Sequence, residues 1–197
     1  PILSSIIKKK LKKGLGLINA NAIASGAAPL PENLRSWFRK IGIDIINGYG
    51  MTENCAITSQ LFEFDRPGSV GKAAAEVEIK IDSNNSEILM KGPFLMKGYY
   101  KLPDLTKKTI KNGWLHTGDQ GKIDKDGYLF VTGRVKDLFK TTKGKYIEPL
   151  VLESHFAEVS EFEQVCIVGL GLDQPICLGV LSDICLLYTS DAADDRV

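Results

Sequence analysis

The sequence predicts an α/β fold built in two successive parts, and three observations support this. Helix-like and strand-like segments follow one another along most of the 197 residues. Hydrophobic residues make up 44% and charged residues 25% of the chain, as in ordinary soluble globular proteins. After Arg134 the pattern changes to shorter and more quickly alternating segments. We therefore expect a domain boundary near Val135–Lys136, with one domain portion over residues 1–135 and the start of a second over residues 136–183.

The first segment, residues 2–13, is predicted to be an amphipathic helix. Its isoleucines and leucines recur on one helical face, and its lysines lie on the other. A helix lying on a membrane surface would have a similar pattern. A solvated lysine face on an ordinary helix is several times commoner, so the latter interpretation is preferred.

Two strands and a second helix follow. Residues 18–26 predict a short strand that ends in small residues, and residues 43–47 predict another strand. Between them, residues 31–42 predict a helix with Pro31 in the first turn and Gly42 at the C-terminal end. The apolar stripe expected to face the core consists of Leu34, Trp37, Phe38 and Ile41.

Two hairpins are expected in the middle of the chain. Residues 77–81 alternate between polar and apolar and are expected to pair with residues 87–91 across the turn DSNN. The segment KIDKDGYLFVTG, residues 122–133, resembles half of a calcium loop. With Gly127 at the sixth position, however, the first and twelfth positions hold a lysine and a glycine where a calcium loop needs carboxylates. The segment is therefore predicted to be a hairpin with a tight DKDG turn.

The second part is expected to hold a TTKGK turn, a helix and two strands. Residues 148–159 predict a helix, with Pro149 near its start and Leu152, Phe156 and Val159 in its apolar stripe. Residues 163–170 and 176–181 predict the strands. The last fourteen residues, 184–197, carry no cap or core pattern and resemble translated adaptor sequence, so we expect them to be non-native.

Composition excludes several classes of protein. The net charge of +1 gives no sign of a nucleic-acid partner. No apolar run approaches the ~20 residues of a membrane-spanning helix. The cysteines lack metal-binding or redox spacing and are expected to be buried in a reducing compartment: Cys55, Cys166, Cys177 and Cys185. Because the chain starts at Pro1, we expect it to be an internal piece of a longer protein.

Four segments carry groups suited to a nucleotide. SGAAPL (25–30) lets the backbone approach a flat ligand, and NGYGMTEN (47–54) combines glycines with an aromatic, a hydroxyl and a carboxylate. GWLHTGD (113–119) ends in a carboxylate that can accept two hydroxyl hydrogen bonds, and GRVKDLFKTTKGKYIEP (133–149) is cationic. Each segment alone is a weak signal. No pair of a nucleophile and a base, and no lysine-bearing glycine-rich loop, accompanies them.

In this order, the four segments resemble the adenylate-forming superfamily, and most closely its bacterial-type long-chain fatty-acid–CoA ligases. The likeness runs from about Asn19 to Asp183. It implies an α/β fold in which the C-terminal part of a large AMP-binding domain is followed by the start of a small α+β lid domain. It also implies that a phosphate loop belongs before Pro1 and an adenylating lysine after Asp183, so that residues 1–197 alone would be inactive.

The resemblance implies a role for each matching position. The adenine and the acyl carbonyl would be bordered by Gly26, Ala27 and Ala28. Asn47 and Gly48 would meet the adenine edge, and Tyr49 would stack on its face.

The α-phosphate, the metal ion and the ribose would be bound by four further residues. Thr52 would bind the α-phosphate and Glu53 would hold Mg²⁺, while Asp119 and Arg134 would bind the ribose.

Two positions after the expected boundary also take roles from the resemblance. Lys136 would be the hinge of the lid domain, and Gly144 would line the channel for the pantetheine arm. Gly144 is placed less securely, because its turn is one residue longer than in many relatives.

The implied activity is activation of a fatty acid with ATP, Mg²⁺ and coenzyme A, through an acyl-adenylate. The implied location is the cytoplasm, including peripheral association with the inner face of the membrane. Two alternatives stay open: an enzyme that adenylates aryl or amino acids, and a catalytically silent nucleotide-binding homologue. The sequence indicates neither the acyl chain length nor the oligomeric state.

Overall fold

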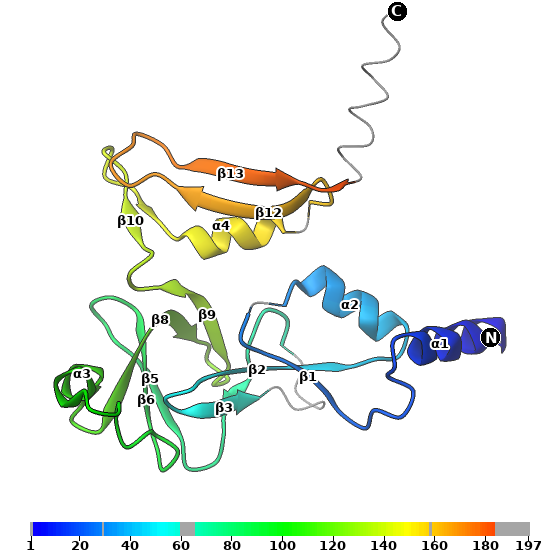
Figure 1. Ribbon diagram of the computed structural model, residues 1–197, viewed down its shortest axis with the longest axis horizontal. Coiled ribbons are helices and arrows are strands. Elements are labelled where there is room, and N and C mark those ends of the chain that lie inside the picture. The colour runs from blue at the N-terminus through cyan, green and yellow to red at the C-terminus, as the bar shows by residue number, and fades with distance from the viewer. Residues whose placement is uncertain (1, 29, 60–65, 158, 184–197) are drawn as a thin grey trace, which may run out of the picture.

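The computed structural model describes residues 2–28, 30–59, 66–157 and 159–183. Its helices are α1 (Ile2–Gly14), α2 (Glu32–Lys40), α3 (Pro103–Thr109) and α4 (Pro149–Phe156). Figure 1 shows two bodies joined by the segment that follows β9: one contains α1–α3 and β1–β9, and the other contains α4 and β10–β13. The mixed α/β character expected from the sequence is confirmed. The assignment of residues 1–135 and 136–183 to separate domains stays a prediction.

The first sheet has the order β1–β2–β3–β4. Its strands are β1 (Ile23–Ser25), β2 (Ile45–Met51), β3 (Cys55–Ser59) and β4 (Lys72–Ala73). β1 and β2 are parallel, with Ser25 opposite Asn47, whereas β3 is antiparallel to β2 and to β4. Phe38 of α2 packs against a buried cluster of Ile41, Ile43 and Ile45 beside this sheet. The register brings the start of the SGAAPL segment next to the start of NGYGMTEN.

The second sheet has the order β5–β6–β8–β7, and β9 pairs with the other part of β8. Its strands are β5 (Glu78–Ile81), β6 (Glu87–Lys91), β7 (Ile110–Lys111), β8 (Trp114–Ile123) and β9 (Leu129–Arg134). Its core is a fully buried cluster of Ile88, Met90 and Leu129. Both expected hairpins are confirmed, since β5 is antiparallel to β6 and β8 is antiparallel to β9. A bridge between Gly71 and Leu129 ties the two sheets together.

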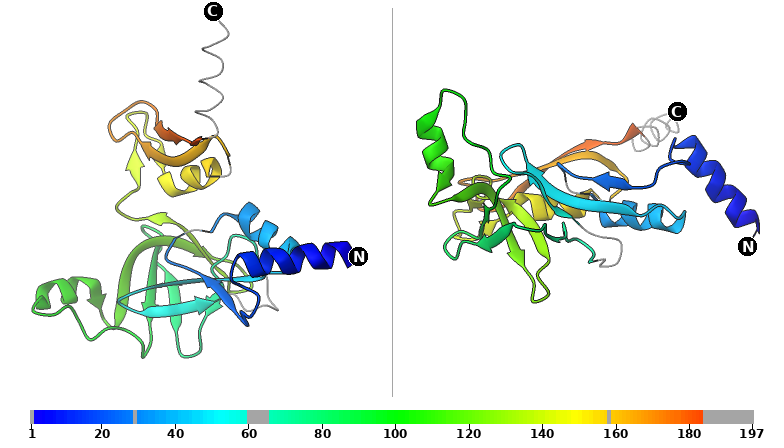
Figure 2. Two further views of the ribbon diagram at one scale, coloured as in Figure 1. Left: turned by 45° about the vertical axis from the view of Figure 1, so that its right-hand side comes forward. Right: turned by 90° about the horizontal axis from the view of Figure 1, so that it is seen from below.

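After Arg134 the chain forms a hairpin of β10 (Phe139–Lys140) and β11 (Tyr146–Ile147), then α4, then a second hairpin of β12 (Phe162–Val168) and β13 (Ile176–Leu181). α4 lies along one face of the β12–β13 hairpin, as Figures 1 and 2 show. The helix and strands expected here are confirmed, with Pro149 in the first turn of α4. The proposed adaptor-like tail lies outside the described residues.

Several expectations need correction. The expected strand over 18–26 is short, because β1 covers only Ile23–Ser25. Pro31 precedes α2 as its N-cap residue and does not lie inside the first turn. Leu34 and Trp37 are 44% and 45% exposed, so only the Phe38 and Ile41 end of the predicted stripe reaches the core.

The prediction that the cysteines are buried is wrong for Cys55, Cys166 and Cys177, which are exposed. Cys166 and Cys177 lie on a two-stranded sheet, where they pair with Leu178 and Ile167, and such a sheet has too few strands to bury both faces. Cys185 lies outside the described residues. The apolar side chains Ile6 and Ile7 of α1 are also exposed. No helix in the described part of the chain combines the length and the hydropathy needed to cross a bilayer.

Candidate functional site

Asp119 lies at the centre of a polar cluster built from three strands. Its side chain is buried, and its Oδ2 accepts a hydrogen bond from the hydroxyl of Tyr49 on β2 at 2.6 Å. Its Oδ1 lies 3.1 Å from Nε of Arg134, which is its cross-strand partner on β9. The Arg134 side chain is 68% exposed. Three residues that were predicted from separate motifs are therefore in direct contact.

Tyr49 joins the polar cluster to the core of the second sheet. Its ring packs against the cluster of Ile88, Met90 and Leu129, while its hydroxyl bonds to Asp119. Burial, reinforced by this hydrogen bond to a carboxylate, raises the pKa of Tyr49 well above its usual range. The phenol is therefore a stable donor at neutral pH and fixes one oxygen of Asp119. Stacking of this ring on adenine stays a prediction.

Small residues are needed where the first two motifs meet. A Cβ added to Gly26 would lie 3.3 Å from the carbonyl oxygen of Gly48, and one added to Gly48 would lie 3.0 Å from the carbonyl oxygen of Thr58. Ala27, which follows Gly26, adopts a positive φ of 69°. The Asn47 amide is half-buried and donates a hydrogen bond to the Ser69 carbonyl at 3.2 Å. The two motifs thus form one small-residue wall, with Gly26, Ala27 and Ala28 exposed along it.

The turn after β2 presents Thr52 and Glu53. Asn54 is fully buried and fixes this turn, because its Oδ1 accepts the Met51 N–H at 2.9 Å. Thr52 is exposed, and the half-buried Glu53 accepts a hydrogen bond from the Tyr99 hydroxyl to Oε1 at 2.8 Å. That hydrogen bond is the main cause of a raised pKa at Tyr99. Among the described residues, none is hydrogen-bonded to the second oxygen of Glu53.

The Glu53 carboxylate fits the expected Mg²⁺. This ion usually keeps several water ligands and is bound by one or two carboxylates together with substrate phosphates. One carboxylate with a free oxygen is therefore a suitable protein ligand, and the neighbouring Thr52 hydroxyl is suited to a phosphate oxygen. No group of three or more His, Cys, Asp or Glu side chains poised to bind a metal occurs within the described ranges.

Lys136 and Gly144 lie beyond this cluster. Lys136 is exposed in the turn between β9 and β10. Figure 1 shows the segment between these two strands connecting the two bodies. The start of this turn is tied to the Asp119 strand, because the Val135 N–H donates to the Gly118 carbonyl at 2.8 Å. Gly144 has a positive φ of 82° in the turn between β10 and β11 and is exposed.

The DKDG turn is stabilised by one of its own carboxylates. Oδ1 of Asp124 accepts the N–H groups of Asp126 and Tyr128, both at 2.9 Å. The Arg66 guanidinium forms ion pairs with Asp124 and Asp126. Gly127 has a φ of 85°, which suits the tight turn. These contacts agree with the prediction of a hairpin turn.

Two residues that the sequence did not single out support the site. Tyr99 contacts Glu53, and the buried Glu87 bonds the backbone next to Asp119. Glu87 begins the strand EILMK, whose next three residues are buried. The sequence showed only a carboxylate at the start of an apolar strand, and the pairing with β8 that gives Glu87 its role is visible only in the structure.

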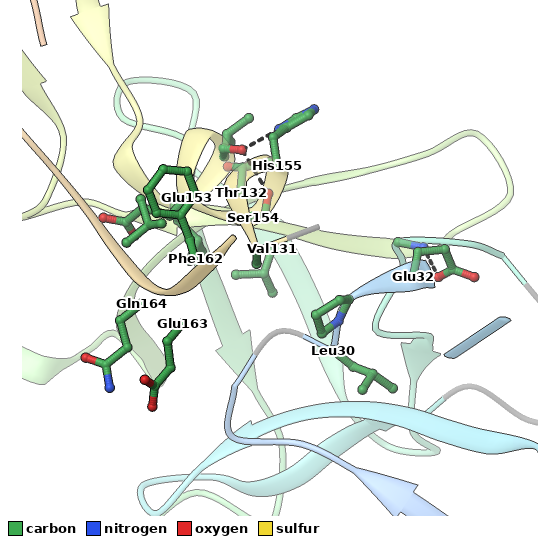
Figure 3. A pocket seen from close by; sticks show the side chains of 16 residues that line it. Leu30, Glu32, Val131, Thr132, Glu153, Ser154, His155, Phe162, Glu163 and Gln164 are labelled. Carbon is green, nitrogen blue, oxygen red and sulfur yellow. Dashed lines mark hydrogen bonds between the residues drawn. The ribbon is translucent and has the colours of Figure 1, made fainter. Parts of the chain in front are cut away.

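A separate cavity of about 460 Å³ lies between the two bodies. Figure 3 shows it bordered by Leu30 and Glu32 on one side and by α4 and β12 residues on the other. Two of its polar groups are engaged within the protein: Glu153 accepts the Ile167 N–H at 2.8 Å, and Nδ1 of His155 lies 2.6 Å from the Val151 carbonyl. None of the predicted site residues lines it.

Comparison with known proteins identifies the family. Residues 3–100 match the family of AMP-binding enzymes, and the chain is 35% identical over 184 residues to long chain acyl-CoA synthetase 5 of Arabidopsis thaliana. The chain belongs to the adenylate-forming, AMP-binding superfamily. This confirms the resemblance drawn from the four motifs. The match covers 86% of this chain but only 28% of the plant protein, so the chain spans less than a third of that relative.

Other members of the AMP-binding superfamily show the same relation. The long-chain-fatty-acid–CoA ligase FadD15 of Mycobacterium bovis is 32% identical over 169 residues, covering 85% of this chain and 28% of the ligase. The o-succinylbenzoate CoA synthetase MenE of Bacillus subtilis, solved with the acyl-adenylate OSB-AMP, superposes with a TM-score of 0.76 at 30% identity. That match covers 90% of this chain and 40% of the synthetase. The same synthetase has also been solved with ATP and magnesium ion, with a TM-score of 0.74 and 29% identity over 90% of this chain and 40% of that structure.

Proposed function

We propose that the protein containing this chain is an ATP-dependent long-chain fatty-acid–CoA ligase. In its first step the fatty-acid carboxylate attacks the α-phosphorus of ATP, which releases pyrophosphate and forms an acyl-adenylate. In its second step the thiol of coenzyme A attacks the acyl carbon, and AMP leaves. The names of the relatives from Arabidopsis thaliana and Mycobacterium bovis support the fatty-acid substrate. We propose a cytoplasmic location, with peripheral association at the inner face of the membrane.

The observation that carries the proposal is the contact of Asp119 with Tyr49 and Arg134. A carboxylate has about four acceptor positions, and these two contacts occupy only part of them. We infer that Asp119 accepts both ribose hydroxyls of the nucleotide. The cation of Arg134 makes a charge-assisted contact with the carboxylate and adds a donor toward the ribose. Tyr49 limits rotation of the carboxylate and so holds the acceptor positions in place.

The other predicted site residues position the reacting groups, and none of them acts as a nucleophile. We propose that the wall of Gly26, Ala27 and Ala28 borders the adenine and the acyl carbonyl, and that Asn47 and Gly48 meet the adenine edge. Thr52 donates its hydroxyl to the α-phosphate. Catalysis by such a site comes chiefly from orientation and charge stabilisation.

Glu53 would hold Mg²⁺, which supplies positive charge to the phosphate oxygens when it is bound. Tyr99 orients the carboxylate for this contact, leaving its second oxygen for the ion. We further propose that Lys136 is the hinge on which the lid domain rotates between the two steps, and that Gly144 lines the channel for the pantetheine arm of coenzyme A.

The test is acid-dependent exchange of pyrophosphate into ATP by the full-length protein, with a panel of acids. Palmitate, a medium-chain acid, benzoate and an amino acid separate the fatty-acid hypothesis from adenylation of aryl or amino acids. We expect the highest kcat/KM with a long-chain acid. A preference for benzoate would favour the aryl alternative, and no exchange with any acid would favour a silent nucleotide-binding homologue.

A further inference from the structure

Glu87 lies opposite an irregular stretch of β8, next to Asp119. Between β6 and β8, Leu89 pairs with His116 and Glu87 pairs with Gln120. Two steps along β6 therefore correspond to four along β8, and β8 bulges outward over residues 117–119. Gly118 has a positive φ of 75° in this bulge. Backbone N–H groups in a bulge cannot all reach the facing strand, so other groups must accept them.

Two side chains supply these acceptors. Oε1 of Glu87 accepts the Gly118 N–H at 2.9 Å, and Oγ1 of Thr117 accepts the Asp119 N–H at 3.1 Å. The Thr117 hydroxyl also donates to the Ile88 carbonyl on β6 at 2.7 Å. Side chains therefore hold the bulge to β6. Glu87 acts at Gly118, the residue before Asp119, and Thr117 acts at the backbone N–H of Asp119 itself.

The second oxygen of Glu87 is engaged as well. It lies 2.9 Å from Nδ1 of His116, and because a carboxylate only accepts, the imidazole donates this hydrogen bond. Glu87 is only 8% exposed. A carboxylate this buried is costly unless both of its oxygens are hydrogen-bonded. The two bonds hold Glu87 in one place and join both ends of the His116–Gly118 stretch to it.

We propose that Glu87 is a positioning residue that sets the place of Asp119 for recognition of the nucleotide ribose. This proposal rests on the proposed function, in which Asp119 accepts the ribose hydroxyls. Without the bond from Gly118 to Glu87, the left-handed turn before Asp119 keeps only the Thr117 bond to β6 and loses the tie at Gly118 itself. The carboxylate then moves relative to the ribose, and small displacements of an orienting group reduce the rate steeply. Glu87 itself touches no substrate in this account.

The test compares Glu87→Ala with wild type in the full-length protein, using ATP and 2′,3′-dideoxy-ATP. We expect Glu87→Ala to lower kcat/KM for ATP by about tenfold or more, mainly through a higher KM for ATP. With dideoxy-ATP, which lacks the hydroxyls that Asp119 binds, the loss should fall below about threefold. A general loss of stability would not distinguish the two nucleotides.

Three further variants sharpen the test. Glu87→Gln keeps an oxygen that can accept the Gly118 N–H, and should stay within about threefold of wild type with ATP. Glu78→Gln removes an exposed carboxylate from the neighbouring strand β5 and is the matched control, expected within about twofold. Adding Glu87→Ala to Asp119→Ala should cost little more than Asp119→Ala alone, because both act on one contact.

If Glu87→Ala fails to fold, Thr117→Val replaces it, because this variant removes the hydroxyl that accepts the Asp119 N–H. Its loss should again be larger with ATP than with dideoxy-ATP. Equal losses with both nucleotides, or Glu87→Gln as damaging as Glu87→Ala, would overturn the positioning role while leaving Asp119 as the ribose residue. If Asp119→Ala itself showed no dependence on the ribose hydroxyls, the role of Asp119 and this inference would both be wrong.

Discussion

Asp119 and Asp124 belong to one hairpin, yet their carboxylates have different kinds of partner. The Asp124 carboxylate accepts hydrogen bonds from the backbone of its own turn, and both N–H donors lie within four residues of it along the chain. Asp119 is held by Tyr49 from β2 and by Arg134 from β9, and its strand is tied to β6 through Glu87. A carboxylate that completes a local turn is structural. One that is buried, held by distant segments and has acceptor capacity left is suited to a ligand.

The most severe variant should be Asp119→Ala in the full-length protein. Losing two charge-assisted hydrogen bonds to the ribose should lower kcat/KM for ATP in adenylation by about two orders of magnitude or more. Pyrophosphate exchange measures this loss. Activity within about threefold of wild type would remove Asp119 from the site and end the contrast with Asp124.

Lys136→Pro tests the segment that leaves the Asp119 cluster. Proline fixes φ and resists the rotation that a hinge requires, so the thioester-forming step should slow by about tenfold more than the adenylating step. Single-turnover measurements of each half-reaction separate the two. Equal slowing of both steps would contradict a hinge at this position.

Tyr99→Phe tests whether a tyrosine hydroxyl orients the Glu53 carboxylate, as Tyr49 orients that of Asp119. The variant removes the hydroxyl that donates to Oε1 of Glu53 but keeps the ring. We expect the Mg²⁺ concentration for half-maximal adenylation to rise by about three- to tenfold, with a smaller change in KM for the acid. An unchanged Mg²⁺ dependence would mean that Tyr99 does not orient the metal ligand.

Tyr49→Phe should have a smaller effect, lowering kcat/KM for ATP by about threefold. Because the pKa of Tyr49 is raised in the folded state, the stability contributed by its hydrogen bond is fully present below the ordinary tyrosine pKa of about 10. It is lost as the pH rises toward the folded-state pKa. Denaturant unfolding of wild type and variant should therefore show a constant difference up to about pH 10 and a shrinking one above it. A difference that vanished near pH 8 would contradict this assignment.

Asp124→Ala and Asp126→Ala should have the least effect on activity. The Asp124 carboxylate is engaged with its own turn and with Arg66, and the Asp126 carboxylate is paired with Arg66, so adenylation should stay within about twofold of wild type. Added calcium should change nothing in either variant. A large loss that calcium modulates would restore the calcium-loop interpretation that the sequence disfavours.

Local patterns were sufficient to predict most elements of the fold. Helices, hairpins and the DKDG turn depend on residues that are close in sequence, such as the proline that begins α4 and the glycine at the turn. Burial was harder to predict, because it depends on which elements pack together. The exposed Cys166 and Cys177 lie on a hairpin that is covered by one helix, on one face only. No sequence pattern predicted how much of this hairpin the helix would cover.

The residues of the Asp119 cluster could be predicted from the sequence, but the residues that support them could not. Asp119 and Arg134 could be named from motifs, and their contact follows from the hairpin register. Glu87 could not, because its role arises from a bulge that appears only when β6 and β8 are paired. The bond between Tyr49 and Asp119 likewise joins two sheets whose relative placement no local pattern fixes.

The central claim is that Asp119 binds the nucleotide ribose, and equilibrium binding tests it most directly. The affinities of wild type and Asp119→Ala for AMP and for 2′,3′-dideoxy-AMP, measured by calorimetry on the full-length protein, form a double-mutant cycle. We predict that wild type binds AMP about tenfold or more tightly than dideoxy-AMP. Asp119→Ala should lose this preference, because the carboxylate contributes to binding only when the ribose hydroxyls are present. An undiminished preference for AMP in Asp119→Ala would contradict the account.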